Sequence, residues 1–148
     1  WLNSKNIELI IEPGRYIVAE SGTLLTTVTT IKENFVGVDA GMTTLIRPAL
    51  YGAYHPIVLA NNIYLEETET LTVVGPICES TDCFAKDRPL PKIKEGDILA
   101  IQIAGAYGFT MSSQYNGQPR PAEVIVSNGC YSLIRKRETT EDLVKNEL

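Results

Sequence analysis

The 148-residue sequence lacks an apolar run of the roughly 20 residues that a membrane-spanning helix requires, and no signal peptide is recognisable. It has one histidine and three cysteines, without the paired spacing of a zinc site, so we expect no bound metal. Basic residues gather only at Arg135, Lys136 and Arg137, and the net charge is -5. This balance argues against nucleic-acid binding, and we expect neither nucleic acid nor membrane as a partner.

The composition is that of a globular protein, with 44% hydrophobic and 21% charged residues. A chain of this length buries roughly 70% of its unfolded surface, which is enough for one domain without disulfides. An odd number of cysteines fits a reducing compartment, and we predict a cytoplasmic location. The start at Trp1, followed almost at once by an apolar segment, suggests the interior of a longer polypeptide.

Short apolar or β-branched segments separated by turn residues predict a mainly β fold, a sandwich or barrel with short helices. Asn128-Gly129 is typical of a type I′ hairpin turn. Helices are predicted at Tyr16–Ser21, from Pro48, and from a cap at Thr139 or Thr140 through Leu148. Strands are predicted at Ile7–Ile11 (buried), Leu24–Ile31, Phe35–Asp39, Leu71–Ile77, Ile98–Ile103, Glu123–Val126 and Tyr131–Arg135.

The segment IEPGR, at residues 11–15, is the first of four motifs that suggest a ligand site. Gly14 can bring backbone N–H groups close to an anion at the start of a helix, and Arg15 offers a planar fork for phosphate or carboxylate. The alternative is an ordinary Pro-Gly turn with surface charges.

The segment LIRPALY, at residues 45–51, places Arg47 four residues before Tyr51. In a helix that begins near Pro48, the two can face one direction and bind a carboxylate together. The alternative is a solvated arginine beside a packing tyrosine. Tyr54 and His55 follow, and we interpret them as packing or loop residues.

Cys78 and Glu79 lie together just after an apolar strand and a Gly-Pro turn. An unperturbed thiol titrates at about 8.5, near enough to neutrality for proton exchange, and a carboxylate can bind an ammonium group. The alternative is a structural cysteine beside a surface glutamate, and we give that interpretation to Cys83.

The segment GAYGF, at residues 105–109, sets Tyr107 among small residues directly after a predicted strand. The small residues leave room for a large group to approach the backbone, and a phenol can donate to a phosphate. The alternative is a β-bulge with an exposed aromatic.

These four motifs, in this order, resemble the C-terminal part of the diaminopimelate decarboxylase family, within the alanine racemase-like (fold type III) pyridoxal-phosphate enzymes. The similarity runs from about Ile10 to the segment ETTEDL, and NFVGVDAGMTTLIRPALYGAYHPI is similar throughout. It implies a single C-terminal β domain over residues 1–148, with residues 1–20 the end of a preceding (β/α)8 barrel. No lysine here has the context of the one that binds the cofactor, which belongs to that barrel. We therefore expect this chain alone to be inactive and to leave a strand edge open.

The resemblance also implies roles for individual residues. The cofactor, pyridoxal 5'-phosphate, would be contacted by Glu12 at its ring nitrogen and by Gly14, Arg15 and Tyr107 at its phosphate. The substrate would be held by Arg15, Arg47, Tyr51, Glu79 and Tyr107, with Glu79 at the distal amino-acid end. Cys78 would be the catalytic acid that returns a proton after CO2 leaves, and its loop would reach the neighbouring subunit's site in a homodimer.

The implied reaction converts meso-2,6-diaminopimelate to L-lysine and CO2. One alternative is an ornithine- or arginine-type decarboxylase, although these relatives usually have aspartate after the cysteine where this chain has Glu79. Another is a non-catalytic β-barrel interaction module, which would leave four residues unexplained: Arg47, Cys78, Glu79 and Tyr107.

Overall fold

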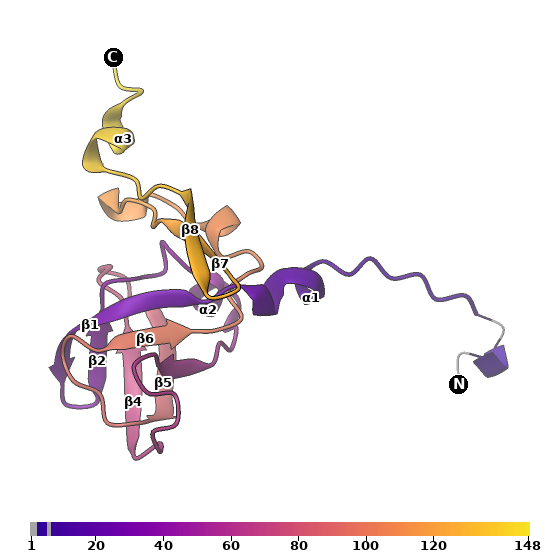
Figure 1. The fold of residues 1–148 in the computed structure, drawn as a ribbon, viewed down its shortest axis with the longest axis horizontal. Helices are drawn as coiled ribbons and strands as arrows, with labels where there is room; N and C mark the ends of the chain where they lie inside the picture. Colours follow the sequence, from indigo (N-terminus) through magenta and orange to yellow (C-terminus); the bar gives the residue numbers. More distant parts are fainter. Residues whose placement is uncertain (1–2, 6) are drawn as a thin grey trace.

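The computed structural model describes residues 3–5 and 7–148. Six strands form one sheet in the order β3-β6-β1-β2-β4-β5, in which β2 and β4 run parallel and the other neighbours antiparallel. The sheet curls into a nearly closed barrel, which confirms the predicted mainly β class (Figure 1). Its strands are β1 (Leu24–Lys32), β2 (Phe35–Val38), β3 (Ile57–Leu59), β4 (Glu69–Val74), β5 (Cys83–Leu90) and β6 (Ile98–Ile101).

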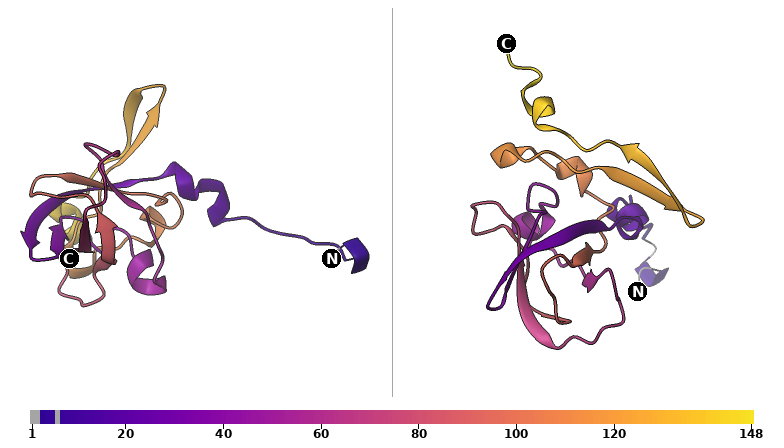
Figure 2. Two further views of the ribbon diagram at one scale, coloured as in Figure 1. Left: turned by 90° about the horizontal axis from the view of Figure 1, so that it is seen from below. Right: turned by 60° about the vertical axis from the view of Figure 1, so that its left-hand side comes forward.

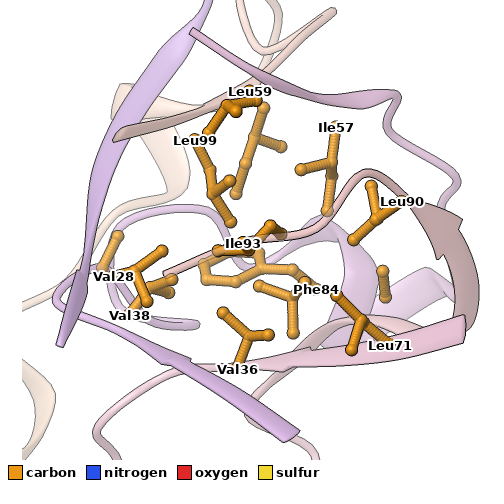
Figure 3. Packing of buried hydrophobic residues seen from close by; sticks show 14 of the residues in the cluster. Val28, Val36, Val38, Ile57, Leu59, Leu71, Phe84, Leu90, Ile93 and Leu99 are labelled. Carbon is orange, nitrogen blue, oxygen red and sulfur yellow. The ribbon is translucent and has the colours of Figure 1, made fainter. Parts of the chain in front are cut away.

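The core fills the inside of this curled sheet. Val36 and Val38 alternate with exposed or half-buried neighbours along β2, and Leu99 and Ile101 face the same interior from β6. Phe84 of β5 lies in the middle of the cluster (Figure 3). Because the strands present apolar residues to one side, burial of that side stabilises the barrel.

Four of the six sheet strands match the predicted segments, and two were missed. β3 has only three residues. β5 carries Lys86, Asp87 and Arg88 followed by Pro89, which hides the alternating pattern of a strand. Both are edge strands of the sheet, where charged residues and proline are tolerated.

Short helices flank the sheet. The predicted first helix is present as α1 (Arg15–Val18), continued by a 3-10 turn, η2 (Ala19–Ser21). The helix α2 (Arg47–Tyr51) has Pro48 in its first turn and ends at Gly52, whose φ of 61° suits glycine. Further 3-10 turns are η1 (Asn3–Lys5), η3 (Phe109–Met111) and η4 (Tyr115–Gly117).

The last helix, α3 (Thr140–Val144), is shorter than predicted. Thr139 caps it as expected, through a reciprocal pair of hydrogen bonds with Asp142. The prediction that it continues through Leu148 is wrong: the helix buries no residue, and without an apolar face to pack, a short helix is marginal.

The hairpin of β7 (Glu123–Ser127) and β8 (Cys130–Arg135) forms a separate two-stranded sheet. Asn128 and Gly129 have φ angles of 52° and 76°, as the predicted type I′ turn requires. The hairpin projects from the barrel, and its apolar side chains are exposed (Figure 2). Within the described part of the chain, the hairpin, β3 and β5 therefore keep open strand edges, as expected.

The prediction of a buried strand at Ile7–Ile11 is wrong. Residues 7–13 are extended and lead away from the barrel, without a paired strand (Figures 1 and 2). Ile10 is 78% exposed and Ile11 71%. The apolar pattern is that of a buried strand, but residues 7–148 supply no neighbouring strand to cover it.

Candidate active site

Arg47 lies at the centre of a group of predicted site residues. Its guanidinium carbon is 5.5 Å from the ring centre of Tyr51, four residues on in α2, so the two share a face as predicted. The same carbon is 5.9 Å from the ring centre of Tyr107, which follows β6. Residues 60 positions apart in the chain thus meet around one cation, in reach of cation–π attraction.

The IEPGR segment contacts this group through Tyr107. A Cβ atom added to Gly14 would lie 3.3 Å from the Tyr107 hydroxyl oxygen, so the two come close because position 14 has no side chain. Tyr107 itself has a φ of 61°, an uncommon conformation for a bulky residue and often a mark of function. Glu12 lies in the exposed extended segment before α1.

Small residues allow this close approach. A Cβ atom on Gly105 would lie 2.1 Å from the backbone oxygen of Val18, so only glycine lets the GAYGF loop pack against α1. Two backbone hydrogen bonds fix the contact, from Gly105 N to Ala19 O at 2.9 Å and from Ala104 N to Gly22 O at 2.8 Å.

Three buried side-chain nitrogens in the described part of the chain have no hydrogen-bond partner: Arg15 Nε, Arg47 Nε and His55 Nε2. Buried donors without partners are uncommon and costly. Arg47, with an unpaired donor beside two phenols, and Arg15, with another unpaired donor, have the chemistry that binds an anion such as a carboxylate or phosphate.

Cys78 and Glu79 lie in a second group, on the loop of residues 75–82 between β4 and β5, here called the Cys78 loop. Cys78 is exposed. Glu79 Oε1 accepts a hydrogen bond of 2.5 Å from the hydroxyl of Tyr115, and this bond raises the pKa of Tyr115. A carboxylate fixed in this way is oriented to receive an ammonium group.

Glu79 and Tyr115 also line a shallow pocket of about 330 Å³. The other lining residues are Met42, Thr43, Ile46, Thr81 and Ser113. Ile46 directly precedes Arg47, so the pocket borders the start of α2, the helix that carries Arg47. No hydrogen bond, ion pair or ring contact joins the two groups within residues 7–148.

The Cys78 loop is held by Asp82, which sequence reasoning did not single out. Asp82 is buried, and its carboxylate accepts from Met42 N at 2.6 Å and Ile77 N at 2.7 Å. A Cβ atom on Gly75 would lie 2.3 Å from that carboxylate, so the glycine is needed for the loop to close on it. The sequence signal was weak, since an aspartate in a turn is common.

Two other residues were interpreted without a functional role. His55 lies in the irregular segment between α2 and β3 and is fully buried, as the packing or loop interpretation expects, and burial lowers its pKa. Burial raises the pKa of Cys83, whose thiol donates to Ala85 O at 3.4 Å, which agrees with a structural cysteine. No cluster of three potential metal ligands occurs in the described residues, and no helix there is long and apolar enough to span a membrane.

A family model described as the C-terminal sheet domain of pyridoxal-dependent decarboxylases matches residues 15–105. The chain belongs to this family. The match covers α1, the whole six-stranded sheet and the first three residues after Gln102, and it confirms the resemblance inferred from the four motifs.

The chain is 55% identical, over 142 residues, to a diaminopimelate decarboxylase of Methanothermobacter thermautotrophicus, covering 94% of this chain and 33% of that relative. A relative of the same name from Archaeoglobus fulgidus is 52% identical over 143 residues, covering 95% and 34%. The chain thus spans about a third of the length of these curated relatives.

Two solved structures differ in their similarity to this chain. The diaminopimelate decarboxylase of Helicobacter pylori, complexed with L-lysine, is 48% identical with a TM-score of 0.84, covering 92% of this chain and 34% of that one. The lysine/ornithine decarboxylase of Vibrio vulnificus, complexed with putrescine, is 26% identical with a TM-score of 0.63, covering 74% and 30%.

Proposed function

We propose that this chain is the C-terminal part of a diaminopimelate decarboxylase, which converts meso-2,6-diaminopimelate to L-lysine and CO2 with pyridoxal 5'-phosphate. Residues 1–20 would be the end of a preceding barrel domain that carries the cofactor lysine; the longer chain is called the parent polypeptide below. The observation that carries the proposal is the contact of the Arg47 cation with Tyr107, in a chain far more similar to diaminopimelate decarboxylases than to the lysine/ornithine enzyme.

The residues present fit the phosphate of the cofactor. Arg15 has an unpaired buried donor, and the Tyr107 hydroxyl lies close to Gly14, where no side chain blocks a ligand. The helix α1 begins at Arg15, so its first N–H groups add to the positive potential. When bound, the cofactor supplies the sink for the electron pair of the broken carbon–carboxylate bond.

The substrate is a doubly zwitterionic molecule, so its pocket needs both a cation and an anion. Arg47 and Tyr51 would bind a carboxylate, and Glu79 would bind the distal ammonium group, in the orientation that Tyr115 fixes. The Cys78 thiol would donate a proton to the carbon that has lost CO2. Exposure of Cys78 supports this role, because a proton donor must reach its acceptor.

A homodimer would bring the two groups together, with the Cys78 loop of one subunit completing the site around the partner's arginines. No hydrogen bond, ion pair or ring contact joins the two groups within residues 7–148, which supports this arrangement. To test it, Arg47→Ala and Cys78→Ser parent polypeptides, each inactive alone, would be denatured together and refolded. A shared site predicts recovery of about a quarter of wild-type activity, because half the dimers are mixed and each holds one intact site. No recovery would contradict it.

We place the enzyme in the cytoplasm. All three cysteines are free, although Cys78 and Cys130 are exposed, and free surface thiols persist in a reducing compartment. Cell fractionation with an antibody against the chain tests this, and recovery in a secreted fraction would refute it.

The decisive experiment measures CO2 release by the purified parent polypeptide, supplied with cofactor, from meso-diaminopimelate, ornithine, arginine and lysine. We expect kcat/KM for diaminopimelate to exceed the others by roughly 100-fold or more, because substrates without the distal carboxylate leave an arginine unpaired. Comparable use of ornithine would identify an ornithine-type enzyme, and no turnover of any substrate would favour an interaction module. The 148-residue chain alone should release no CO2.

A further inference from the structure

His55 connects the elements that carry the arginine group. It follows α2, and its fully buried ring lies with Nδ1 2.9 Å from the carbonyl oxygen of Gln102, at the end of β6. Because a carbonyl oxygen can only accept, Nδ1 carries the hydrogen and donates it. In the neutral ring Nε2 is then left with a lone pair, as a hydrogen-bond acceptor.

Among residues 3–5 and 7–148, this acceptor has no hydrogen-bond partner, and the two buried side-chain donors without one belong to Arg15 and Arg47. The ring stays neutral because burial above all, and then the charges of Arg47, Arg15 and Arg88, lower the pKa of His55 and outweigh the hydrogen bond to Gln102, which raises it. His55 and Arg47 are also held by the same two elements: both lie on α2 or the chain just after it, and Gln102, which binds the His55 ring, is followed by the loop of Tyr107, whose ring centre is 5.9 Å from the Arg47 guanidinium carbon.

The backbone of His55 is also fixed. The carbonyl oxygen of His55 accepts a hydrogen bond of 2.9 Å from Nη1 of Arg88, whose guanidinium carbon lies 4.0 Å from the ring centre of Tyr54. A ring anchored at its backbone and at Nδ1 presents Nε2 in one direction, which is what a residue that orients a neighbour requires.

We propose that His55 is a positioning residue for Arg47: with substrate bound, His55 Nε2 accepts a hydrogen bond from the Arg47 guanidinium and fixes the plane that meets the substrate carboxylate. The inference rests on the proposed function of Arg47. A neutral acceptor suits this position because it orients the guanidinium without cancelling its charge, as a carboxylate would. An apolar residue would leave the arginine donor buried and unpaired.

Two variants of the parent polypeptide separate this role from simple packing. His55→Asn keeps a donor near the Nδ1 position and loses the acceptor at Nε2, whereas His55→Gln places a carbonyl oxygen near Nε2 and loses the donor. Calorimetric titration measures the dissociation constants of L-lysine, which has a carboxylate, and of 1,5-diaminopentane, which has none. Steady-state assays give kcat and KM for diaminopimelate.

For His55→Asn we expect L-lysine to bind roughly threefold to tenfold more weakly, with a similar rise in KM, a smaller fall in kcat, and unchanged binding of 1,5-diaminopentane. For His55→Gln we expect L-lysine binding nearer to wild type. Equal losses for the two ligands, wild-type L-lysine binding by His55→Asn, or a larger defect in His55→Gln would overturn the proposal. Each of these results leaves the proposed reaction intact, because wild-type turnover is measured separately.

A measurement on the wild-type protein covers the case in which the variants do not fold. Nitrogen-15 NMR of labelled histidines should show the unprotonated nitrogen of His55 shifting upfield when L-lysine binds, as an acceptor nitrogen does on receiving a hydrogen bond. An unchanged resonance would contradict the predicted bond.

Discussion

Replacement of Asp82 by asparagine should release the Cys78 loop. The buried carboxylate accepts from two backbone N–H groups, Met42 N at 2.6 Å and Ile77 N at 2.7 Å. Asparagine can accept from only one of them and turns its own NH2 group toward the other. Bonds to a charged group contribute about 1.5–3 kcal/mol each, so the loss of one costs about 2–3 kcal/mol. The loop should therefore open roughly 30- to 150-fold more often.

Hydrogen–deuterium exchange of the parent polypeptide measures this opening directly. Peptides that contain Met42 and residues 75–82 should exchange faster in Asp82→Asn, while peptides from β1 and β6 should not. The kcat for diaminopimelate should fall by about 100-fold, since a displacement of about 1 Å at a reacting group can cost that much. Asp87→Asn is the matched control, because Asp87 is exposed and its φ of 46° suits asparagine. Wild-type exchange and kcat in Asp82→Asn would show that the carboxylate does not hold the loop.

Three further changes test other contacts in the parent polypeptide. Tyr115→Phe removes the hydroxyl that donates to Glu79. It should raise KM for diaminopimelate by roughly threefold to tenfold while the melting temperature stays within about 1 °C of wild type. An unchanged KM would show that Glu79 needs no orienting bond. Arg120 holds the pKa of Glu138 down to about 2, so this pair stabilises the fold above the ordinary glutamate pKa and stops doing so as the pH falls from about 4.5 toward 2. The difference in melting temperature between wild type and Glu138→Gln should therefore be largest at neutral pH and vanish in acid, and a difference independent of pH would contradict this. In Gly105→Val, side-chain atoms would press against the backbone oxygen of Val18 in α1, which a Cβ alone would already approach to 2.1 Å. The melting temperature should therefore fall by several degrees. An unchanged melting temperature would mean that α1 is free to move.

Turn chemistry and local pattern made much of the fold predictable. Asn128-Gly129 predicted the hairpin turn because few other residue pairs adopt two positive φ angles easily. In the structure both residues have a positive φ. Thr139 and Asp142 are spaced as a capping pair, which located the start of the last helix but not its end. Each of these signals consists of residues that are close together in the chain, so a single sequence is enough to recognise the turn and the helix cap.

The remaining elements depend on contacts that a local pattern does not contain. The strand β5 is recognised by its pairing with β4, since Lys86, Asp87 and Pro89 would argue against it in isolation. Ile7–Ile11 shows the opposite error, in which a correct apolar pattern has no neighbouring strand among residues 7–148. The part played by Asp82 was missed for the same reason, because its bond to Met42 spans 40 positions in the sequence.

The start of α2 explains why the candidate site divides into two groups. Ile46 faces the pocket of Glu79, while the next residue, Arg47, faces Tyr107. Successive residues of a helix project about 100° apart, so the two groups lie on different sides of the same turn. Under the proposed function, the Glu79 carboxylate that receives the substrate's distal ammonium group would come from a second copy of the chain, and this division of the site, rather than the size of the exposed surface, is the argument for a shared site.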